Sequence, residues 1–184
     1  MDVAQAPQPT VILAEDEASL YLQATRQSVW AIQGQTPTVR VDAGRTKTNF
    51  YGTLNLMTGQ VLAMRADKMN AASSAAHLEQ ILQMYPNQNI LLLWDRAPWH
   101  HGAAIRRVLD ANPRLELMIF PVAAPELNPQ EHVWKATRRA VSHNHNEPKL
   151  LGLADHFEKH LTTTQFQSSF LDRYGYNSIR PMFN

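Results

Sequence analysis

The apolar run Ile90-Leu-Leu-Leu-Trp94 is the feature that most constrains the fold of this chain. The run is too short for a helix, and the polar residues Asn89 and Asp95 bound it on either side. A run of this kind is typical of a β-strand buried on both faces, as in a parallel sheet covered by helices. Asp95 therefore falls at the carboxyl end of a central strand, where sites collect in open α/β sheets.

A second apolar run predicts another strand and ends in a proline-rich turn. The run extends from Leu115 to Phe120, and prolines recur between Pro121 and Pro129. Prolines at this density end the strand, and the residues that follow have helical periodicity. Glu131 therefore lies in the first turn of a predicted helix.

That helix is predicted to have one polar and one apolar face. At about 100° per residue, Lys135 and Arg138 fall within about 40° of Glu131. Ser142 falls in the same sector, and Arg139 lies within about 80° of Glu131. The other side carries residues that can pack on a sheet, namely Val133, Trp134, Ala136, Thr137, Ala140 and Val141. A carboxylate suited to a metal ion thus shares a surface with cations suited to phosphate.

Two motifs give the chain a resemblance to a known family. The first is Asp95-Arg-Ala-Pro-Trp-His100, and the second is Phe120-Pro followed by Ala124-Pro-Glu-Leu-Asn-Pro-Gln-Glu131-His-Val-Trp134-Lys. Together they resemble the catalytic domain of IS630 and Tc1/mariner transposases, over a span from about Val11 to about Tyr176. In that family an Asp-Asp-Glu triad on an RNase H-like fold binds divalent metal. The resemblance makes Asp95 and Glu131 the second and third acids, and their spacing is close to the family's.

The first acid is harder to place. The short apolar run Val11-Ile-Leu-Ala14 is predicted to end at Glu15-Asp16-Glu17, three adjacent carboxylates that are costly to bury without a cation. An ordinary solvated turn is the alternative. The family motif, an apolar strand running into Asp-Glu, matches Asp16-Glu17 and makes Asp16 the first ligand. Glu15 departs from the small or apolar residue usual there, so whether Glu15 or Glu17 assists Asp16 stays open.

The rest of the chain supplies the other elements of a mixed sheet. Residues 49–56 and 60–66 read as a hairpin, and Asn70 caps a helix that Pro86 ends. The core face of that helix is Ala71, Ala75, Leu78, Leu82 and Tyr85. Another helix stops at Asn112-Pro113 and has the buried stripe Ala104, Ile105, Val108 and Leu109.

This order, βββαβαβα, predicts an α/β fold with a mixed five-stranded sheet flanked by helices, because parallel crossovers need covering helices. It is the order of an RNase H-like fold, in which the first and fourth strands are adjacent. The resemblance therefore implies that Asp16 and Asp95 lie side by side. We expect a flexible lead over residues 1–10, the catalytic domain over 11–176 and a tail over 177–184.

Beyond Ser142, the polar stretch from His143 to Asn146 is interpreted as a connection and not as a metal site, because family members have a similar turn. A closing helix is predicted from Leu150, Leu151, Leu153, Phe157 and Leu161. A last helix is expected to contain Phe166, Phe170, Leu171, Tyr174 and Tyr176.

One acid and one histidine have competing structural interpretations. An aspartate after a strand often caps the next helix, which is the alternative for Asp95. His100 is expected to orient the site or to touch the scissile phosphate, with a surface or capping role as the alternative. Trp134 is interpreted as a packing anchor, since it lies on the apolar side of its helix.

The basic residues near the predicted acids are expected to bind DNA. Lys135, Arg138 and Arg139 would track phosphates without reading sequence, and Arg96 follows Asp95 directly. In the long segment before the hairpin, the pair Trp30 and Gly34 resembles a family signature. The cations there, Arg40, Arg45 and Lys47, either meet DNA or belong to a solvated loop.

Composition sets further limits. The formal net charge is +1, from 17 basic and 16 acidic side chains, so DNA binding would have to come from a local patch. Residues 96–184 carry the excess of positive charge. The absence of cysteine excludes disulfides and thiolate zinc sites. With no signal peptide and no long apolar span, the chain is expected to be soluble and cytoplasmic, with no membrane partner.

The resemblance implies a reaction and partners. Asp16, Asp95 and Glu131 are expected to hold Mg²⁺, as two ions, with Mn²⁺ as a substitute. The chain would cut DNA at the ends of a mobile element and join them to a target, commonly at TA. It would act as a homodimer or with a chain that carries the helix-turn-helix modules that family members use for end recognition. The alternatives are a catalytically inactive fragment that regulates or assembles with a transposase, and another RNase H-like nuclease.

Overall fold

The computed structural model describes residues 9–36, 38, 44–121 and 127–166. Several sequence predictions fall outside these residues and stay predictions. They concern Arg40, the middle of the proline-rich turn, the last helix beyond Phe166, and nearly all of the two terminal segments.

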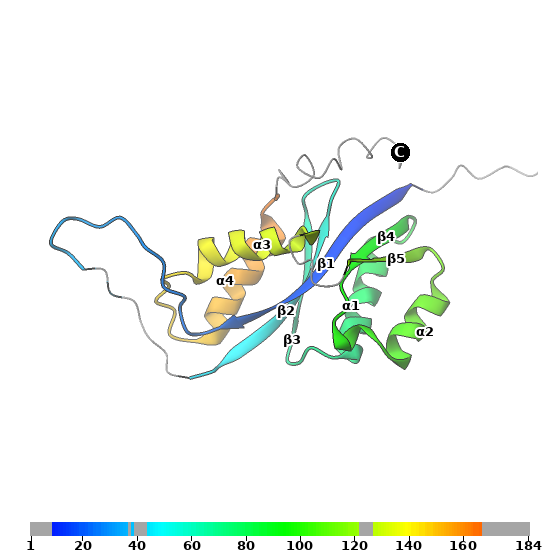
Figure 1. Ribbon diagram of the computed structural model, residues 1–184, viewed down its shortest axis with the longest axis horizontal. Coiled ribbons are helices and arrows are strands. Elements are labelled where there is room, and N and C mark those ends of the chain that lie inside the picture. Colours follow the sequence, from blue (N-terminus) through cyan, green and yellow to red (C-terminus); the bar gives the residue numbers. More distant parts are fainter. Residues whose placement is uncertain (1–8, 37, 39–43, 122–126, 167–184) are drawn as a thin grey trace, which may run out of the picture.

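A five-stranded mixed sheet forms the centre of the molecule, as predicted (Figure 1). Its strand order is β3-β2-β1-β4-β5. The pairs β1–β2 and β2–β3 are antiparallel, whereas β1–β4 and β4–β5 are parallel. The strands are β1 (Thr10–Tyr21), β2 (Lys47–Asn55), β3 (Val61–Ala66), β4 (Asn89–Trp94) and β5 (Leu115–Ile119). The first and fourth strands are neighbours, as the resemblance implies.

Helices cover both faces of the sheet, and alternate residues of β1 point into the two layers between them. Ile12 and Ala14 join the core under α3 (Gln130–Thr137) and α4 (Leu150–Thr163). Val11 and Leu13 join the core under α1 (Ala71–Met84) and α2 (Ala103–Ala111). None of the described helices has the length and apolar character needed to span a bilayer.

Strand β1 is longer than predicted, and this changes the setting of the three acids. The sequence predicted that the strand ends before Glu15, but it pairs with β2 as far as Tyr21. Glu15, Asp16 and Glu17 therefore lie inside the strand and alternate between its faces. The solvated-turn interpretation is wrong, since Glu15 is 1% exposed.

The helix that carries Glu131 changes from α-helical to π-helical winding after Thr137. Beyond α3, the residues Arg138–Ser142 form a π-helical turn, closed by a hydrogen bond of 2.8 Å from the His143 amide to the Arg138 carbonyl. A π turn inserts an extra residue, so the 100° rotation no longer holds beyond it. Ser142, predicted on the polar face, is consequently buried.

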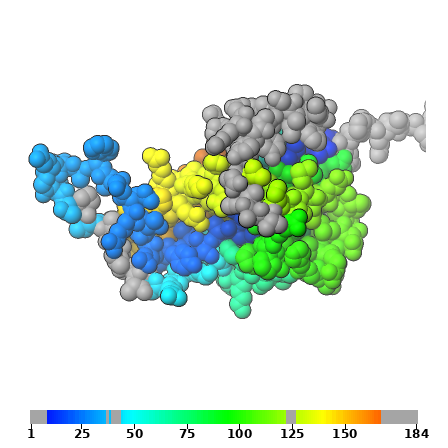
Figure 2. Space-filling view, in the orientation of Figure 1, coloured from blue at the N-terminus to red at the C-terminus, as the bar shows by residue number. Residues whose placement is uncertain are grey.

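An extended arm projects from one end of the body (Figures 1 and 2). Residues 22–36 belong to it, and Trp30 is fully exposed on it. The base of the arm is held by the side-chain amide of Asn144, which both accepts from the Gln27 amide and donates to the Gln27 carbonyl at 2.9 Å. The polar stretch from His143 to Asn146 is thus a connection, as predicted.

Helix α1 buries a polar row that the sequence analysis did not identify. Asn70 caps this helix as predicted, accepting a hydrogen bond of 2.9 Å from the Ser73 amide. On the sheet side, His77 is 1% exposed and its Nε2 lies 2.8 Å from Thr53 Oγ1. Burial lowers the pKa of His77 to about 4.

We expect His77 to make the fold sensitive to acid. Its pKa in the folded chain, about 4, lies below the ordinary value of 6.5, so the unfolded chain binds the extra proton between these values. Lowering the pH from 7 to 4 should therefore remove up to about 3 kcal/mol of stability from the wild type relative to His77→Gln. Denaturant unfolding at several pH values measures this difference, with the surface substitution His101→Gln as control. Parallel pH curves for wild type and His77→Gln would contradict the expectation.

Candidate active site

The parallel pairing of β1 with β4 brings two of the predicted acids to the same level. Ala14 pairs with Leu93, and continuing this register two residues further sets Asp16 opposite Asp95. Since both strands run in the same direction, the two aspartates lie at one edge of the sheet.

Asp16 faces the α3 side of β1 and is held there by an indole. The Nε1 group of Trp134 donates a hydrogen bond of 2.9 Å to Asp16 Oδ2. This approach requires Gly52, the residue that pairs with Asp16 on β2, because a Cβ at Gly52 would lie 2.5 Å from Trp134 Cη2. Trp134 is thus the packing anchor that its position predicted and also a hydrogen-bond donor to the first acid.

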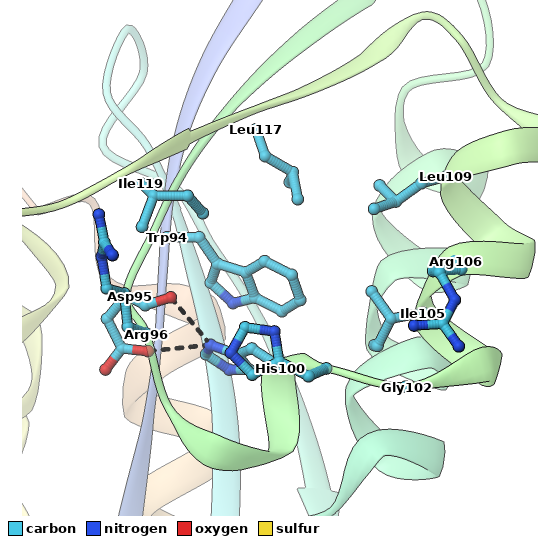
Figure 3. Close-up of a pocket in the computed structure, with 11 residues that line it drawn as sticks. Trp94, Asp95, Arg96, His100, Gly102, Ile105, Arg106, Leu109, Leu117 and Ile119 are labelled. Atoms are coloured by element: carbon cyan, nitrogen blue, oxygen red, sulfur yellow. Dashed lines mark hydrogen bonds and ion pairs between the residues drawn. The ribbon is translucent and has the colours of Figure 1, made fainter.

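Asp95 begins the turn that follows β4 (Figure 3). Its Oδ1 accepts 2.8 Å from the Ala97 amide and lies 2.9 Å from His100 Nδ1. The bond from His100 lowers the pKa of Asp95 below its ordinary value. Both contacts use Oδ1, which leaves Oδ2 for another ligand on a side chain that is 43% exposed. Asp95 therefore holds the turn after β4 through the Ala97 amide, whereas the predicted alternative, a cap of the next helix, is wrong because Gly102 occupies that position of α2. Its second oxygen remains available to the site.

Glu131 is brought to the site by Asn128, which joins the start of α3 to β1. The Asn128 side chain donates 3.0 Å to the Glu15 carbonyl and accepts 3.0 Å from the Gln130 amide. Asn128 is buried, so both bonds are shielded from water. The start of the helix that carries the third acid is thereby held against β1, one residue before Asp16.

The pKa of Asp16 reflects how close the Glu131 carboxylate lies to it. Burial, together with the nearby carboxylates of Glu131 and Glu17, raises the pKa of Asp16 to about 7. Carboxylates crowded in this way repel one another unless a cation joins them. Oxygen donors of this kind suit hard divalent ions such as Mg²⁺, so the donor set fits such an ion.

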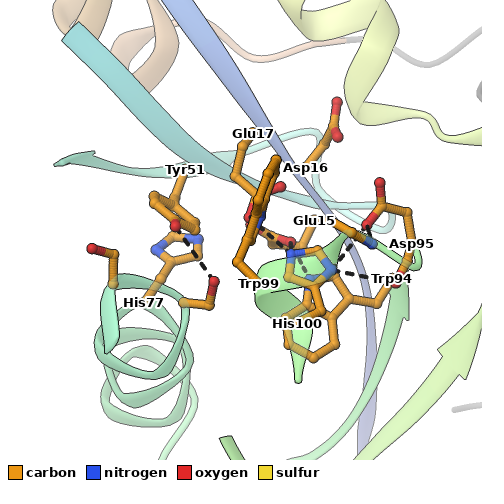
Figure 4. A network of polar contacts seen from close by, with 12 residues as sticks. Glu15, Asp16, Glu17, Tyr51, His77, Trp94, Asp95, Trp99 and His100 are labelled. Atoms are coloured by element: carbon orange, nitrogen blue, oxygen red, sulfur yellow. Dashed lines mark hydrogen bonds and ion pairs between the residues drawn. The ribbon is translucent and has the colours of Figure 1, made fainter. Parts of the chain in front are cut away.

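On the opposite face of β1, Glu15 and Glu17 surround His100 (Figure 4). His100 Nε2 lies 2.8 Å from Glu17 Oε1, and Trp99 Nε1 donates 2.7 Å to the same oxygen. Trp94 Nε1 donates to Glu15 Oε2. Burial opposes a charge on His100, yet its bonds to Asp95 and Glu17 raise its pKa to about 10. His100 is therefore an internal cation that links β1 to Asp95.

This arrangement settles how the neighbours of Asp16 relate to it. Glu15 and Glu17 point to the other side of the strand from Asp16, and Glu17 acts on the site through His100. His100 is 5% exposed and both ring nitrogens are engaged. The contact with DNA predicted for His100 therefore has no free ring nitrogen to make it, and the orienting role is the one that the geometry supports.

The other predicted DNA-binding residues lie at the surface. Lys135 and Arg139 are exposed and Arg138 is half-buried, on or just after α3. Arg96 is exposed next to Asp95. In the part of the chain that the structure describes, none of these four forms a salt bridge with an acidic side chain.

Sequence reasoning missed three residues that position the acids. Gly52 acts by letting Trp134 approach β1 closely, and Asn128 acts by a hydrogen bond to the backbone of Glu15. Neither role produces a periodic pattern in the sequence. The role of Glu17 depends on a contact with His100 across 83 residues. The pairing of Asn128 with the following proline, within the recognised motif, was the one available indication for that residue.

The chain is similar in sequence to known proteins. Residues 11–150 match the family model of the DDE superfamily endonucleases. The chain is 25% identical over 146 residues to the insertion element IS630 uncharacterized 39 kDa protein of Shigella sonnei. The match covers 79% of this chain and 42% of that protein. The chain thus spans about two fifths of the length of that relative.

Solved structures share the fold. The Mos1 transposase paired-end complex with the left transposon end matches with a TM-score of 0.65 and 18% identity, over 83% of this chain and 48% of that one. The Mos1 transposase catalytic domain with raltegravir and Mg matches with a TM-score of 0.58 and 14% identity, over 84% of this chain and 72% of that one. The predicted RNase H-like fold is confirmed by this likeness.

We expect Trp134→Phe to weaken divalent-ion binding while leaving the fold intact. The change keeps an aromatic ring beside Phe157 but removes the donor that lowers the pKa of Asp16. Asp16 should then be protonated to a higher pH, so Mn²⁺ affinity should fall about tenfold near pH 7 and recover in part near pH 8.5. Calorimetric titration with Mn²⁺ at both pH values measures this, and equal affinity for variant and wild type would refute it.

Gly52→Ala should separate Trp134 from Asp16 by steric conflict. The added methyl meets a buried indole that cannot retreat, so we expect a loss of stability of about 1–3 kcal/mol and weaker Mn²⁺ binding. Gly152→Ala is the matched control, because its methyl would meet only the end of the Glu147 side chain. Thermal unfolding and Mn²⁺ titration of both variants test the point, and similar behaviour of the two would count against it.

Proposed function

Because the chain belongs to the DDE superfamily of endonucleases, we propose that it is the catalytic domain of a transposase, cutting and joining DNA with divalent metal. The observation that carries the proposal is the position of Asp16 on β1, close enough to Glu131 for that carboxylate to raise its pKa, with Asp95 directly after the neighbouring parallel strand β4. Buried carboxylates such as Asp16 and Glu131, which come close together from distant parts of the sequence, repel one another and so favour a shared cation.

Asp16, Asp95 and Glu131 would hold the metal, as two Mg²⁺ ions with Mn²⁺ as substitute. Bound divalent ions activate a water or hydroxyl for attack on phosphorus and stabilise the leaving oxygen. The chain's own contribution is to hold the carboxylates in place. Trp134 fixes one oxygen of Asp16, and His100 fixes one oxygen of Asp95. Because these contacts restrict rotation of the two side chains, the second oxygen of each aspartate has a defined position.

The exposed cations would bind the DNA backbone. Lys135 lies one turn beyond Glu131 on α3, and Arg138 follows it, so phosphates held there run past the third acid. Arg96 extends the positive surface to the side of Asp95. Such contacts set the position of DNA and carry no sequence information. His100 is left out of this set because of its burial.

The reaction would be strand cleavage at element ends and transfer to a target, with TA as the expected site. The Mos1 transposase with this fold is seen in a paired-end complex with the left transposon end. By analogy, two copies of this chain, or this chain with one that carries helix-turn-helix modules, would hold two ends together. The competing proposal is an inactive chain that regulates or assembles with a transposase.

Cleavage assays separate these proposals. We expect the chain to nick a DNA duplex in the presence of Mn²⁺ or Mg²⁺ and to lose this activity with EDTA. Asp16→Asn, Asp95→Asn and Glu131→Gln should each lower the rate at least about 100-fold, because each removes a ligand charge. Asp110→Asn, a change of an exposed acid on α2, is the matched control.

Equal cleavage by wild type and Asp95→Asn would remove the basis of the proposal. No cleavage by a wild type that still binds DNA would favour the inactive partner. Faster cleavage of an RNA/DNA hybrid than of duplex DNA would instead indicate another RNase H-like nuclease.

A further inference from the structure

Strand β5 forms one edge of the central sheet, with α2 beside it (Figure 1). Among the described residues, no further strand pairs with its outer side. Sheet edges are usually shielded by charges, prolines or bulges, because an unpaired strand can add another chain. Besides one exposed acid, Glu116, β5 exposes apolar side chains, since Met118 is 53% and Ile119 is 41% exposed.

The backbone of β5 has hydrogen-bonding groups that point away from β4. The Phe120 amide donates a hydrogen bond of 2.8 Å to the Trp94 carbonyl. In a parallel pair, alternate residues of one strand bond to the other, so the even-numbered residues of β5 face β4. The amides and carbonyls of Leu117 and Ile119 therefore face outward. Within the part of the chain that the structure describes, no strand lies there to bond with them.

The side chains of Leu117 and Ile119 line a cavity of about 520 Å³ between β5 and α2 (Figure 3). Trp94, Ile105 and Leu109 supply the rest of its apolar wall. The cavity lies on the α1 and α2 side of the sheet, opposite to the face of β1 that carries the first predicted metal ligand. A strand added to the edge of β5 would place every second side chain over this cavity.

Two arginines make the surroundings of the cavity positive. Arg96 and Arg106 line it, and both are exposed. In the described residues, neither forms a salt bridge with an acidic side chain. The cavity therefore favours a segment with acids on the face that also carries its apolar side chains. A second copy of the chain fits less well, because antiparallel pairing of two β5 strands would put the arginines of both copies on the same face.

We propose that the outer edge of β5 binds an extended segment of a partner protein by strand addition, with apolar side chains in the cavity and an acidic side chain on Arg106. Main-chain hydrogen bonds to Leu117 and Ile119 supply affinity, and the cavity and the arginine select the side chains. The inference goes beyond the proposed function and needs no cleavage, because the bound segment lies on the face opposite to Asp16.

Binding of synthetic peptides tests the proposal. The probe is a fluorescently labelled peptide with valine and leucine at alternate positions, glutamate at both ends of the same face, and threonine between. A second peptide has lysine in place of glutamate. Two more carry N-methyl groups, one on the apolar residues and the other on the threonines. Only one of these two sets of amides faces β5 in a given strand direction.

Two pairs of variants locate the binding. Arg106→Glu reverses the charge at the cavity, and Arg107→Glu is the matched control, since Arg107 is exposed on the same helix but does not line the cavity. Ile119→Pro removes the outward amide without removing a bond to β4. Ile119→Ala also shortens the side chain but keeps the amide. Fluorescence anisotropy gives the dissociation constant of each protein and peptide.

We expect the wild type to bind the glutamate peptide at least about tenfold more tightly than the lysine peptide. Arg106→Glu should weaken this binding about tenfold, and Arg107→Glu should leave it unchanged. Ile119→Pro should weaken it more than Ile119→Ala, and one of the two methylated peptides should lose binding. If Ile119→Pro fails to fold, the methylated peptides test the same hydrogen bonds.

Absence of binding by the wild type overturns the proposal, as does equal binding by Arg106→Glu and Arg107→Glu. Binding of both methylated peptides also overturns it, because the main chain would then make no contribution. Self-association that Ile119→Pro abolishes, without peptide binding, overturns it in favour of a second copy. Peptide binding is measured without metal or DNA, so its outcome is independent of the cleavage assays.

Discussion

Three consecutive carboxylates inside a strand that is covered on both faces are the constraint on which the rest of this structure depends. Water cannot solvate them fully, so each needs a donor or a cation from the layer that it faces. The α1 and α2 side supplies indole donors and the imidazolium of His100 to Glu15 and Glu17. On the α3 side, the indole of Trp134 donates a hydrogen bond to Asp16, but the other charged group there is a second carboxylate, that of Glu131.

The two faces of β1 therefore differ in purpose as well as in composition. On one face a buried histidine stands between acids, and its bonds hold the strand end and the following turn together. On the other face, no cation among the described residues forms a salt bridge with Asp16 or Glu131, and burial of Asp16 intensifies the repulsion between these two acids. The negative charge on the α1 and α2 side is thus neutralised by His100, whereas the negative charge on the α3 side is not. This difference favours the binding of a cation on the α3 side of the sheet.

The sequence allowed much of this to be predicted, but for two different reasons. The strand before Asp95, the hairpin and the cap at Asn70 followed from local patterns, which depend on neighbours in sequence. The three acids came from the resemblance, because no local pattern shows that strands far apart in sequence will pair. The continuation of β1 was missed because charged residues usually end a buried strand, and their partners, Trp94, Trp99 and Trp134, belong to distant segments. The π turn after α3 and the burial of His77 were missed since both depend on packing that periodicity does not describe.

The double hydrogen bond of Asn128 has a consequence for how such chains diverge. One amide ties the first turn of α3 to the backbone of β1, so the location of Glu131 is set at the anchor and not by the connection that leads to it. The stretch between Ile119 and Asn128 is then free to gain or lose residues over generations while the third carboxylate keeps its place. The hydrogen bonds of Asn128 thus permit related chains to differ in the number of residues between the last two acids.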